Sequence, residues 1–88
     1  MSASDEFATA QIRVKSLAKT PASDELLMLY SLYKQGTAGD VAGKRPGMLD
    51  IKGRAKYDAW KKLSGTNSDE AQKRYVDLVQ KLAGKYGE

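Results

Sequence analysis

Residues 67–86 read NSDEAQKRYVDLVQKLAGKY, and their spacing predicts a long amphipathic helix. Asn67 stands three residues before Glu70, which is the spacing of a capping box at a helix start. The apolar residues recur on one arc: Ala71, Tyr75, Leu78, Val79, Leu82 and Tyr86. The opposite side is charged and carries Lys73, Arg74, Asp77 and Lys81. An arc of this width has to be covered by other helices, so this segment predicts a helical bundle.

Three more helical patterns precede it, and no stretch alternates with the period of two that a strand requires. The first runs from about Ser4, its expected N-cap, to Ala18, with Phe7, Ala10, Val14 and Leu17 on one face. The second runs from Ser23, again as N-cap, to Gln35 or Thr37. The third runs from Asp50 to Ser64, and we expect Gly65 to take a left-handed conformation after it. The predicted fold is therefore an all-α four-helix bundle, with one long crossover between the second and third helices.

The chain has 88 residues, which is enough for one domain, residues 1–88. It contains no Cys and no His, so disulfides, thiolate metal sites, thiol nucleophiles and the usual general base are excluded. We therefore expect no enzyme activity, no cofactor and no metal site. No segment approaches the roughly 20 apolar residues that span a bilayer. The first residues are acidic and polar, unlike a signal peptide, so we expect a soluble, cytoplasmic protein.

The positive charge is concentrated in the middle of the chain. Residues 34–62 hold eight basic and three acidic residues, a net charge of +5, whereas the rest of the chain carries −1. A local positive field suggests an anionic partner, which could be a phosphate, a nucleic acid or a membrane surface. The alternative is a solvated basic surface with no partner, and charge alone does not decide between the two.

The second helix carries two apolar stripes. An aliphatic stripe suited to a core contains Met28, Leu29, Leu32 and Gly36. The opposite stripe contains Leu26, Leu27, Tyr30, Tyr33 and Lys34. A helix that is apolar on both sides either lies between two neighbours or lines a ligand groove. The first arrangement explains the leucines, and the second also explains why two phenols and an ammonium group follow them.

Basic residues also gather at the start of the third helix, where Lys52 and Lys56 share a face and Arg54 lies in the same turns. Cations there oppose the helix dipole, and a bound anion would reverse this by meeting free N–H groups and two ammonium groups. The alternative is that water screens the charges and Asp50 offsets part of them. Tyr75, in the middle of the last apolar arc, is by itself better explained as a core residue.

Two blocks of this sequence resemble the acyl-CoA-binding protein family, also called diazepam-binding inhibitor or endozepine. They are YSLYKQGTAGD at residues 30–40 and RPGMLDIKGRAKYDAW at residues 45–60. Phe7 near the start and the Lys-Tyr-Gly of residues 85–87 also fit, so the resemblance covers nearly the whole chain. Two long blocks at the right separation make the resemblance specific.

The resemblance implies an up-down-down-up bundle and a non-catalytic, monomeric carrier that binds one long-chain acyl-CoA, such as palmitoyl-CoA, and forms an intracellular pool of it. It implies no nucleic-acid partner and at most transient membrane contact. The ligand-binding residues that it implies are Lys15, Tyr30, Tyr33, Lys34, Lys52, Lys56 and Tyr75. The stripe and turn of the second helix add Leu26, Leu27, Ser31 and Leu32, although the helical wheel points Leu32 toward the core.

The chain departs from the family pattern at two positions. Gly36 replaces a usual Ala, which we expect to loosen the second helix by roughly 1 kcal/mol, and Tyr57 replaces a usual Trp. The alternative function is a small basic nucleic-acid-binding domain, since residues 60–63 and 71–75 have a passing likeness to an HMG box. The acidic N-terminus and the confined charge argue against it. A role as a peptide messenger has no support in these residues.

Overall fold

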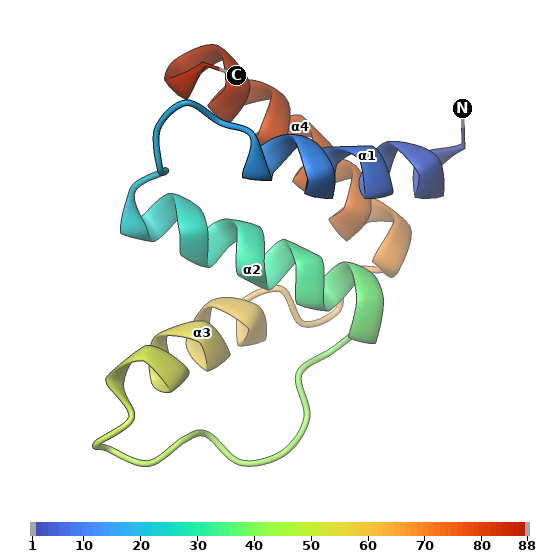
Figure 1. Cartoon of the computed structure of the whole chain (residues 1–88). Coiled ribbons are helices and arrows are strands. Elements are labelled where there is room, and N and C mark those ends of the chain that lie inside the picture. The colour runs from blue at the N-terminus through green and yellow to red at the C-terminus, as the bar shows by residue number, and fades with distance from the viewer. Residues whose placement is uncertain (1, 88) are drawn as a thin grey trace.

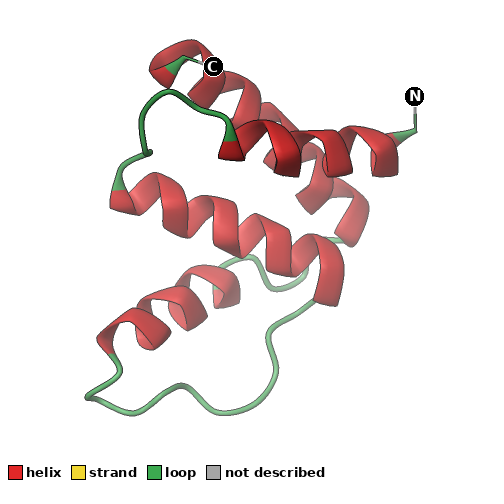
Figure 2. Ribbon diagram, viewed as in Figure 1, coloured by secondary structure: helices red, strands yellow, loops and turns green. Residues whose placement is uncertain are grey.

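The computed structural model describes residues 2–87, which form four helices joined by loops, with no strand among them (Figures 1 and 2). The helices are α1 (Ala3–Lys15), α2 (Ser23–Ala38), α3 (Ile51–Lys61) and α4 (Ser68–Tyr86). The predicted all-α class is confirmed. Met1 and Glu88, the ends of the predicted single domain, lie outside the described residues. None of the helices within residues 2–87 is long and apolar enough to cross a membrane.

The helices pack around α2 and α4. Helix α4 packs against both α1 and α2, and α3 packs against α2. In Figure 1, α2 and α3 run in the same direction, while α1 and α4 run broadly against them. This is the predicted up-down-down-up order. The crossover that connects the two parallel helices, residues 39–50, loops out beside α3 (Figure 1).

The core lies between α1, α2 and α4, as the apolar arcs predict. Its buried residues are Phe7, Ala10, Leu29, Leu32, Tyr75, Val79 and Leu82. The prediction that Met28 belongs to this core is wrong, because its side chain is 48% exposed. At its level the space between α2 and α4 is an open groove of about 380 Å³, which Leu63 and Leu78 also line.

Two helices begin one or two residues earlier than their predicted caps. The N-cap of α1 is Ser2 rather than Ser4: its hydroxyl accepts the Asp5 N–H, and the Asp5 carboxylate accepts the Ser2 N–H. This reciprocal pair is a capping box, which Ser4 cannot form because Phe7 stands three residues after it. The N-cap of α2 is Ala22, whose N–H donates to the Glu25 carboxylate. Helix α1 also ends at Lys15, before the predicted Ala18.

The predicted starts of α3 and α4 are confirmed, whereas the end of α3 differs. Asp50 caps α3 and Asn67 caps α4, each through a side-chain oxygen that accepts a backbone N–H. Helix α3 ends at Lys61, three residues earlier than predicted, and a run of turns continues to Gly65. Gly65 has a φ of +90°, the positive value that we expected there and that a residue with a side chain rarely adopts.

The buried amide of Gln35 holds the two long connections against the bundle. Its Nε2 atom donates to Asp40 Oδ1 and to the Thr66 carbonyl oxygen, both at 2.7 Å. Its Oε1 atom accepts from Trp60 Nε1 at 3.1 Å. The α2 side chain therefore contacts the crossover, α3 and the loop before α4 at once. These bonds fix how α3 lies along α2.

Both departures from the family pattern have a structural setting. Gly36 lies where α2 and α4 approach closely, and a Cβ atom there would stand 2.9 Å from Gln72 Cγ. The Gln72 amide donates to the Gly36 carbonyl oxygen at 2.9 Å. This bond between α4 and α2 offsets part of the loss of helix stability that we expect from glycine at this position. The Tyr57 hydroxyl donates to the Gly43 carbonyl oxygen at 3.1 Å and attaches the crossover to α3.

Candidate ligand-binding site

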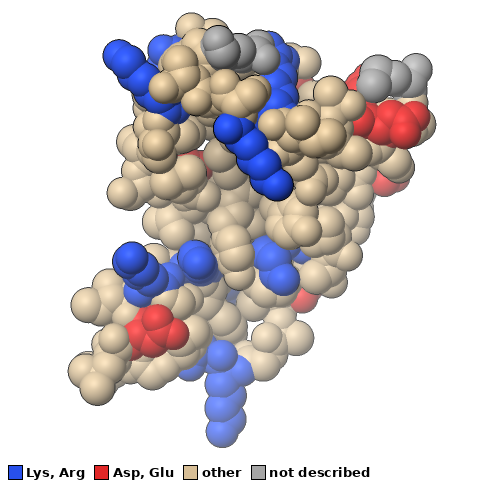
Figure 3. Space-filling view, viewed as in Figure 1, with Lys and Arg blue, Asp and Glu red and all other residues tan. Residues whose placement is uncertain are grey.

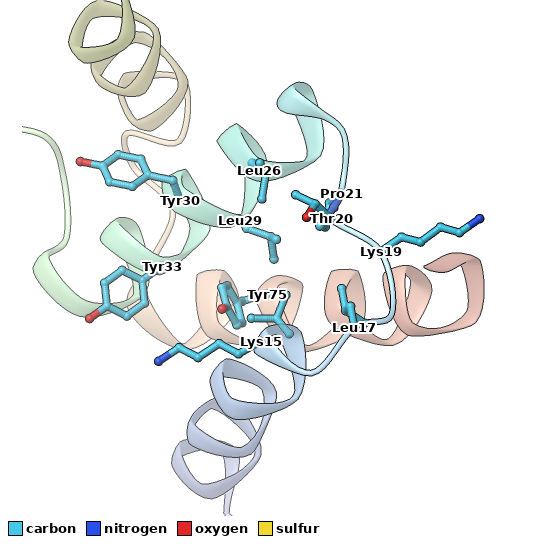
Figure 4. Close-up of a pocket in the computed structure, with 11 residues that line it drawn as sticks. Lys15, Leu17, Lys19, Thr20, Pro21, Leu26, Leu29, Tyr30, Tyr33 and Tyr75 are labelled. Carbon is cyan, nitrogen blue, oxygen red and sulfur yellow. The ribbon is translucent and has the colours of Figure 1, made fainter. Parts of the chain in front are cut away.

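Two hollows flank the second apolar stripe of α2, and together they form the candidate site. The first, which we call the α1–α2 hollow, measures about 420 Å³ and lies between the end of α1, the loop after it and α2 (Figure 4). Within residues 2–87 the backbones of α1 and α2 do not approach each other closely, and side chains such as Phe7 and Tyr33 meet between them, which leaves room for the hollow. It is lined by Val14, Lys15, Leu17, Lys19, Thr20, Pro21, Leu26, Leu29, Tyr30, Tyr33 and Tyr75.

Aromatic rings form the base of the α1–α2 hollow. Tyr75 is 5% exposed and meets the Phe7 ring edge-on, with 5.1 Å between the centroids. Tyr33 also contacts Phe7 and stacks on its ring, with 6.1 Å between the centroids. Burial raises the pKa of Tyr75 above its usual value of 10.0, and the nearby Tyr33 raises it further. The Tyr75 phenol is therefore neutral at physiological pH and can donate a hydrogen bond.

Basic side chains stand at the edges of this hollow. In Figure 4, Lys15 extends from α1 toward the Tyr33 side of the hollow, whereas Lys19 extends away from it. Both lysines line the cavity, but they direct their ammonium groups differently. Lys15 is thus placed to meet an anionic group that enters between α1 and α2.

The second hollow lies between α2 and α3, and we call it the α2–α3 hollow. It measures about 410 Å³ and is lined by Ser23, Leu26, Leu27, Tyr30, Ile51, Lys52, Ala55 and Lys56. Its lining is mainly apolar, with two lysines from α3. The Lys56 ammonium lies 5.3 Å from the centroid of the Tyr30 ring, within the range of a cation–π contact. An apolar chain and an anionic group could both find partners here.

Leu26 and Tyr30 line both hollows. They are four residues apart, about one turn, and so project from the same side of α2. The Tyr30 ring in Figure 4 points away from Leu29 and the core. The stripe of α2 therefore forms a ridge between the two hollows rather than being buried between two neighbours. A ligand longer than one hollow could lie across this ridge.

The start of α3 is less open to an anion than we expected. The Asp50 carboxylate already accepts the Gly53 N–H, at 2.9 Å. The expectation that the N–H groups at this helix end are free is therefore wrong for Gly53. Because a carboxylate already occupies part of this helix end, we expect the lysine side chains to supply most of the contacts to an anion bound near α3.

Most of the predicted ligand-binding residues meet in these two hollows. Lys15, Tyr33 and Tyr75 line the first, Leu27, Lys52 and Lys56 line the second, and Leu26 and Tyr30 line both. Lys34 lines neither. Its ammonium lies 5.1 Å from the centroid of the Trp60 ring, on the α3 side of α2.

The structure places Ser31 and Leu32, two of the predicted ligand-binding residues, away from both hollows. Ser31 is 1% exposed, and its hydroxyl donates to the Met28 carbonyl oxygen. Leu32 is 3% exposed and belongs to the core, as its helical position predicted. Both project to the interior because they lie about 100° and 200° from Tyr30 on the helix.

Sequence reasoning missed several lining residues. The first group, from α1, the following loop and the core side of α2, is Val14, Leu17, Lys19, Thr20, Pro21 and Leu29. The second group, beside the α2–α3 hollow, is Ser23, Ile51 and Ala55. Ile51 and Ala55 carried a usable signal, since apolar residues four apart mark the face of α3 that turns to α2. The loop residues carried no such signal, because their position depends on how α1 and α2 are joined.

The chain matches the family model described as acyl CoA binding protein over residues 4–79. It is 52% identical over 81 residues to acyl-CoA-binding protein homolog 1 of Caenorhabditis elegans, covering 92% of this chain and 94% of that protein. It is 47% identical over 83 residues to the acyl-CoA-binding protein homolog of Drosophila melanogaster, covering 94% of this chain and 96% of that protein. The crystal structure of Oryza sativa acyl-CoA-binding protein 2 superposes with a TM-score of 0.90 at 37% identity, covering 96% of this chain and 93% of that one. With a family model that spans most of its length and relatives that match it nearly end to end, the chain belongs to the acyl-CoA-binding protein family.

Proposed function

We propose that this protein binds long-chain acyl-CoA thioesters, one per chain, as a single domain of 88 residues. The observation that carries the proposal is the ridge of Leu26 and Tyr30, which lies between a mainly apolar hollow and an aromatic one, both edged by lysines. An acyl-CoA has an apolar chain, an aromatic adenine and several phosphates, so it matches each part of this surface. The names of its relatives support the same ligand class.

We assign the acyl chain to the α2–α3 hollow, where Leu27, Ile51 and Ala55 offer apolar surface. The adenine belongs in the α1–α2 hollow beside Tyr33 and Tyr75. The phosphates lie within the reach of Lys15 on α1 and of Lys52 and Lys56 on α3. Each charge-assisted hydrogen bond of this kind contributes about 1.5–3 kcal/mol. In the free protein the Lys34 ammonium group lies over the Trp60 ring, and we propose that it turns toward the ligand on binding.

The proposed role is that of a carrier. The family consists of binding proteins, and this chain has neither His nor Cys to serve as a base or thiol nucleophile. We propose a monomer that carries acyl-CoA for fatty-acid metabolism in the cytoplasm and maintains a pool of it. The alternative of nucleic-acid binding has no support in the relatives and the solved structure reported above, whose names are those of acyl-CoA-binding proteins.

Isothermal titration calorimetry with palmitoyl-CoA, CoA and palmitate tests this proposal. We expect a molar ratio near one for palmitoyl-CoA and much weaker binding of palmitate, which lacks the phosphates that the lysines would meet. Native mass spectrometry should show one ligand on a single chain. Equal affinity for palmitate and palmitoyl-CoA would contradict the proposal.

The same titrations separate the chain from the head group. Leu27→Ser should weaken the binding of palmitoyl-CoA and leave the binding of CoA unchanged. The loss for palmitoyl-CoA should be smaller than the roughly 1.5–3 kcal/mol that a fully buried leucine contributes. Met28→Ser is the matched control, because Met28 is the next residue but lines the groove on the far side of α2. An equal loss for CoA and palmitoyl-CoA would assign Leu27 to the packing of α2 and not to the chain-binding hollow.

A further inference from the structure

A cluster of large apolar side chains projects into solvent at the entry to α3. Met48 is 79% exposed, Leu49 is 100% exposed and Ile51 is 77% exposed. We call these three residues the apolar tip. A turn in which the Asp50 N–H donates to the Gly47 carbonyl oxygen at 3.0 Å precedes α3 and carries the tip. The tip lies at a corner of the molecule away from α1 and α4 (Figure 1).

Basic side chains surround the apolar tip. Residues 44–56 contain five basic residues and one acid, Asp50, whose carboxylate is engaged by the Gly53 N–H. Lys44, Lys52 and Lys56 are all exposed. Figure 3 shows blue side chains gathered around the α3 end of the molecule, with tan surface forming its outer corner. Apolar side chains among lysines are the composition that favours the interface of an anionic bilayer.

The apolar tip is continuous with the α2–α3 hollow. Ile51 belongs to both, and the neighbouring Lys52 lines the same hollow. An apolar chain that leaves a bilayer at the tip would therefore meet the apolar wall of this hollow directly.

We propose that the apolar tip and its lysines dock this protein on anionic lipid bilayers, with Met48 and Leu49 inserted among the acyl chains and the lysines at the level of the head groups. Long lysine side chains can lie along the apolar surface while their ammonium groups stay at the polar interface. The docking proposal is supported by the exposed apolar tip and its lysines and does not depend on acyl-CoA binding. The use of this docking, the passage of a lipid chain between bilayer and hollow, rests on the proposed function.

A bilayer fits the tip better than a protein partner does. The tip is a projection on a convex corner, and its two most prominent residues are adjacent in the chain, so it offers little flat area to a folded partner. Specific protein interfaces usually bury about 800 Å² on each side. A bilayer accepts a small projection of this kind and adds electrostatic attraction for the lysines around it.

Vesicle co-sedimentation without acyl-CoA tests the docking. The vesicles contain phosphatidylcholine alone or with about a third phosphatidylserine, a level chosen to give a clear negative surface potential. We expect binding to the anionic vesicles that weakens as salt is raised, because exposed charges are screened. The double variant Met48→Ser/Leu49→Ser should bind at least about tenfold more weakly, since two apolar side chains are lost from the lipid. Ile12→Ser is the matched control, because Ile12 is 72% exposed on α1 and lies outside the tip.

Three results would overturn the docking proposal. They are equal sedimentation of the wild type and the double variant, equal binding to neutral and anionic vesicles, and self-association that the double variant abolishes without any vesicle binding. Calorimetry of the double variant with palmitoyl-CoA in solution separates the two proposals, since Met48 and Leu49 line neither hollow. Unchanged solution affinity with lost vesicle binding is the expected outcome. If no variant binds acyl-CoA at all, the proposed function fails while the vesicle result still decides the docking.

Discussion

Gln35 is the polar residue of α2 whose side chain connects three separate segments of the chain. Its side chain is fully buried and joins Asp40, Trp60 and Thr66, which lie on three different segments. Buried polar groups are stabilising only while every partner is satisfied. Asp40 and Trp60 have second partners, the Gly65 N–H and the Gly39 carbonyl oxygen, but Thr66 has no other hydrogen bond at its carbonyl oxygen among the described residues.

Gln35→Leu should lower the free energy of unfolding by about 1–3 kcal/mol, the usual cost of leaving buried polar groups without partners. The change keeps a similar volume, so the loss reports the hydrogen bonds more than the packing. Chemical denaturation measures it. Gln80→Leu, the same substitution on the exposed side of α4, is the control and should change stability little. A loss no larger than that of the control would show that the network contributes nothing to stability.

At the scale of the element, α3 is the helix whose position matters most for the proposed ligand. Within residues 2–87 it has no buried residue, and α2 is the one helix against which it packs. Its lysines are therefore placed by the packing on α2, by the Gln35–Trp60 bond and by bonds between α3 and the crossover. The bonds to the crossover join Tyr57 to Gly43, Trp60 to Gly39 and Asp58 to Arg45. A helix held in this way can present Lys52 and Lys56 to a ligand without contributing to the core.

Lys56→Ala should leave the stability of the fold about the same and should weaken the binding of palmitoyl-CoA by about 1.5–3 kcal/mol. The lost contact with the Tyr30 ring, worth about 0.5–1 kcal/mol at an exposed site, is offset by the removal of a cation close to Lys52 on the same face. Calorimetry at low and high salt and thermal melts measure both effects. The loss of affinity should shrink as salt rises.

Lys61→Ala is the control for this change, because Lys61 lies on α3 but lines neither hollow. A lower melting temperature with unchanged affinity would make Lys56 a structural residue. Unchanged affinity at low salt would remove Lys56 from the site and leave Lys15 and Lys52 as the proposed phosphate contacts that line the two hollows.

The helices were predictable because local rules determine them. The apolar arc of α4, its Asn67 cap and the positive φ of Gly65 all follow from neighbours a few residues apart. The second stripe of α2 placed Leu26 and Tyr30 on one face, but the pattern did not decide whether this face lines a groove or packs between two neighbours. The position of Lys34 over Trp60 was not predictable, because it depends on the packing of α3 against α2. The prediction that Met28 is a core residue was wrong for the same reason. A helical wheel gives the direction of its side chain, but it does not show that the space between α2 and α4 is open at that level.

At the scale of the whole molecule, Glu25 joins the start of α2 to the end of α4. Its carboxylate accepts from the Tyr86 hydroxyl, from Lys85 Nζ at 3.0 Å and from the Ala22 N–H at 2.9 Å. Close by, the Ala18 N–H donates to the Gly87 carbonyl oxygen at 3.0 Å. These bonds fasten the loop between α1 and α2 to the C-terminal turn, and that loop forms one wall of the α1–α2 hollow.

Hydrogen bonds from Tyr86, Ala22 and Lys85 lower the pKa of Glu25 from 4.5 to about 2. Because the folded protein binds this proton more weakly than the unfolded chain does, the ionised carboxylate stabilises the fold above pH 4.5. This contribution is lost as the pH falls from about 4.5 to about 2. The pKa values of Asp40 and Asp58 are lowered as well, by Gly65 and Arg45 respectively, so acid should destabilise the molecule at more than one place.

Glu25→Gln should therefore melt at a lower temperature than the wild type at pH 7, and the difference should shrink toward zero as the pH approaches 2, where the wild-type carboxyl is itself protonated. Thermal melts followed by circular dichroism between pH 7 and pH 2 measure the two curves. Asp24→Asn removes the same charge one residue earlier, at an exposed position in the first turn of α2, and its difference from the wild type controls for net charge and the helix dipole. If the Glu25→Gln and wild-type curves stay parallel down to pH 2, the carboxylate is not what fastens α2 to α4. The attachment of α2 to α4 would then depend on the Ala18–Gly87 bond and on apolar packing around Tyr86, neither of which titrates in this range.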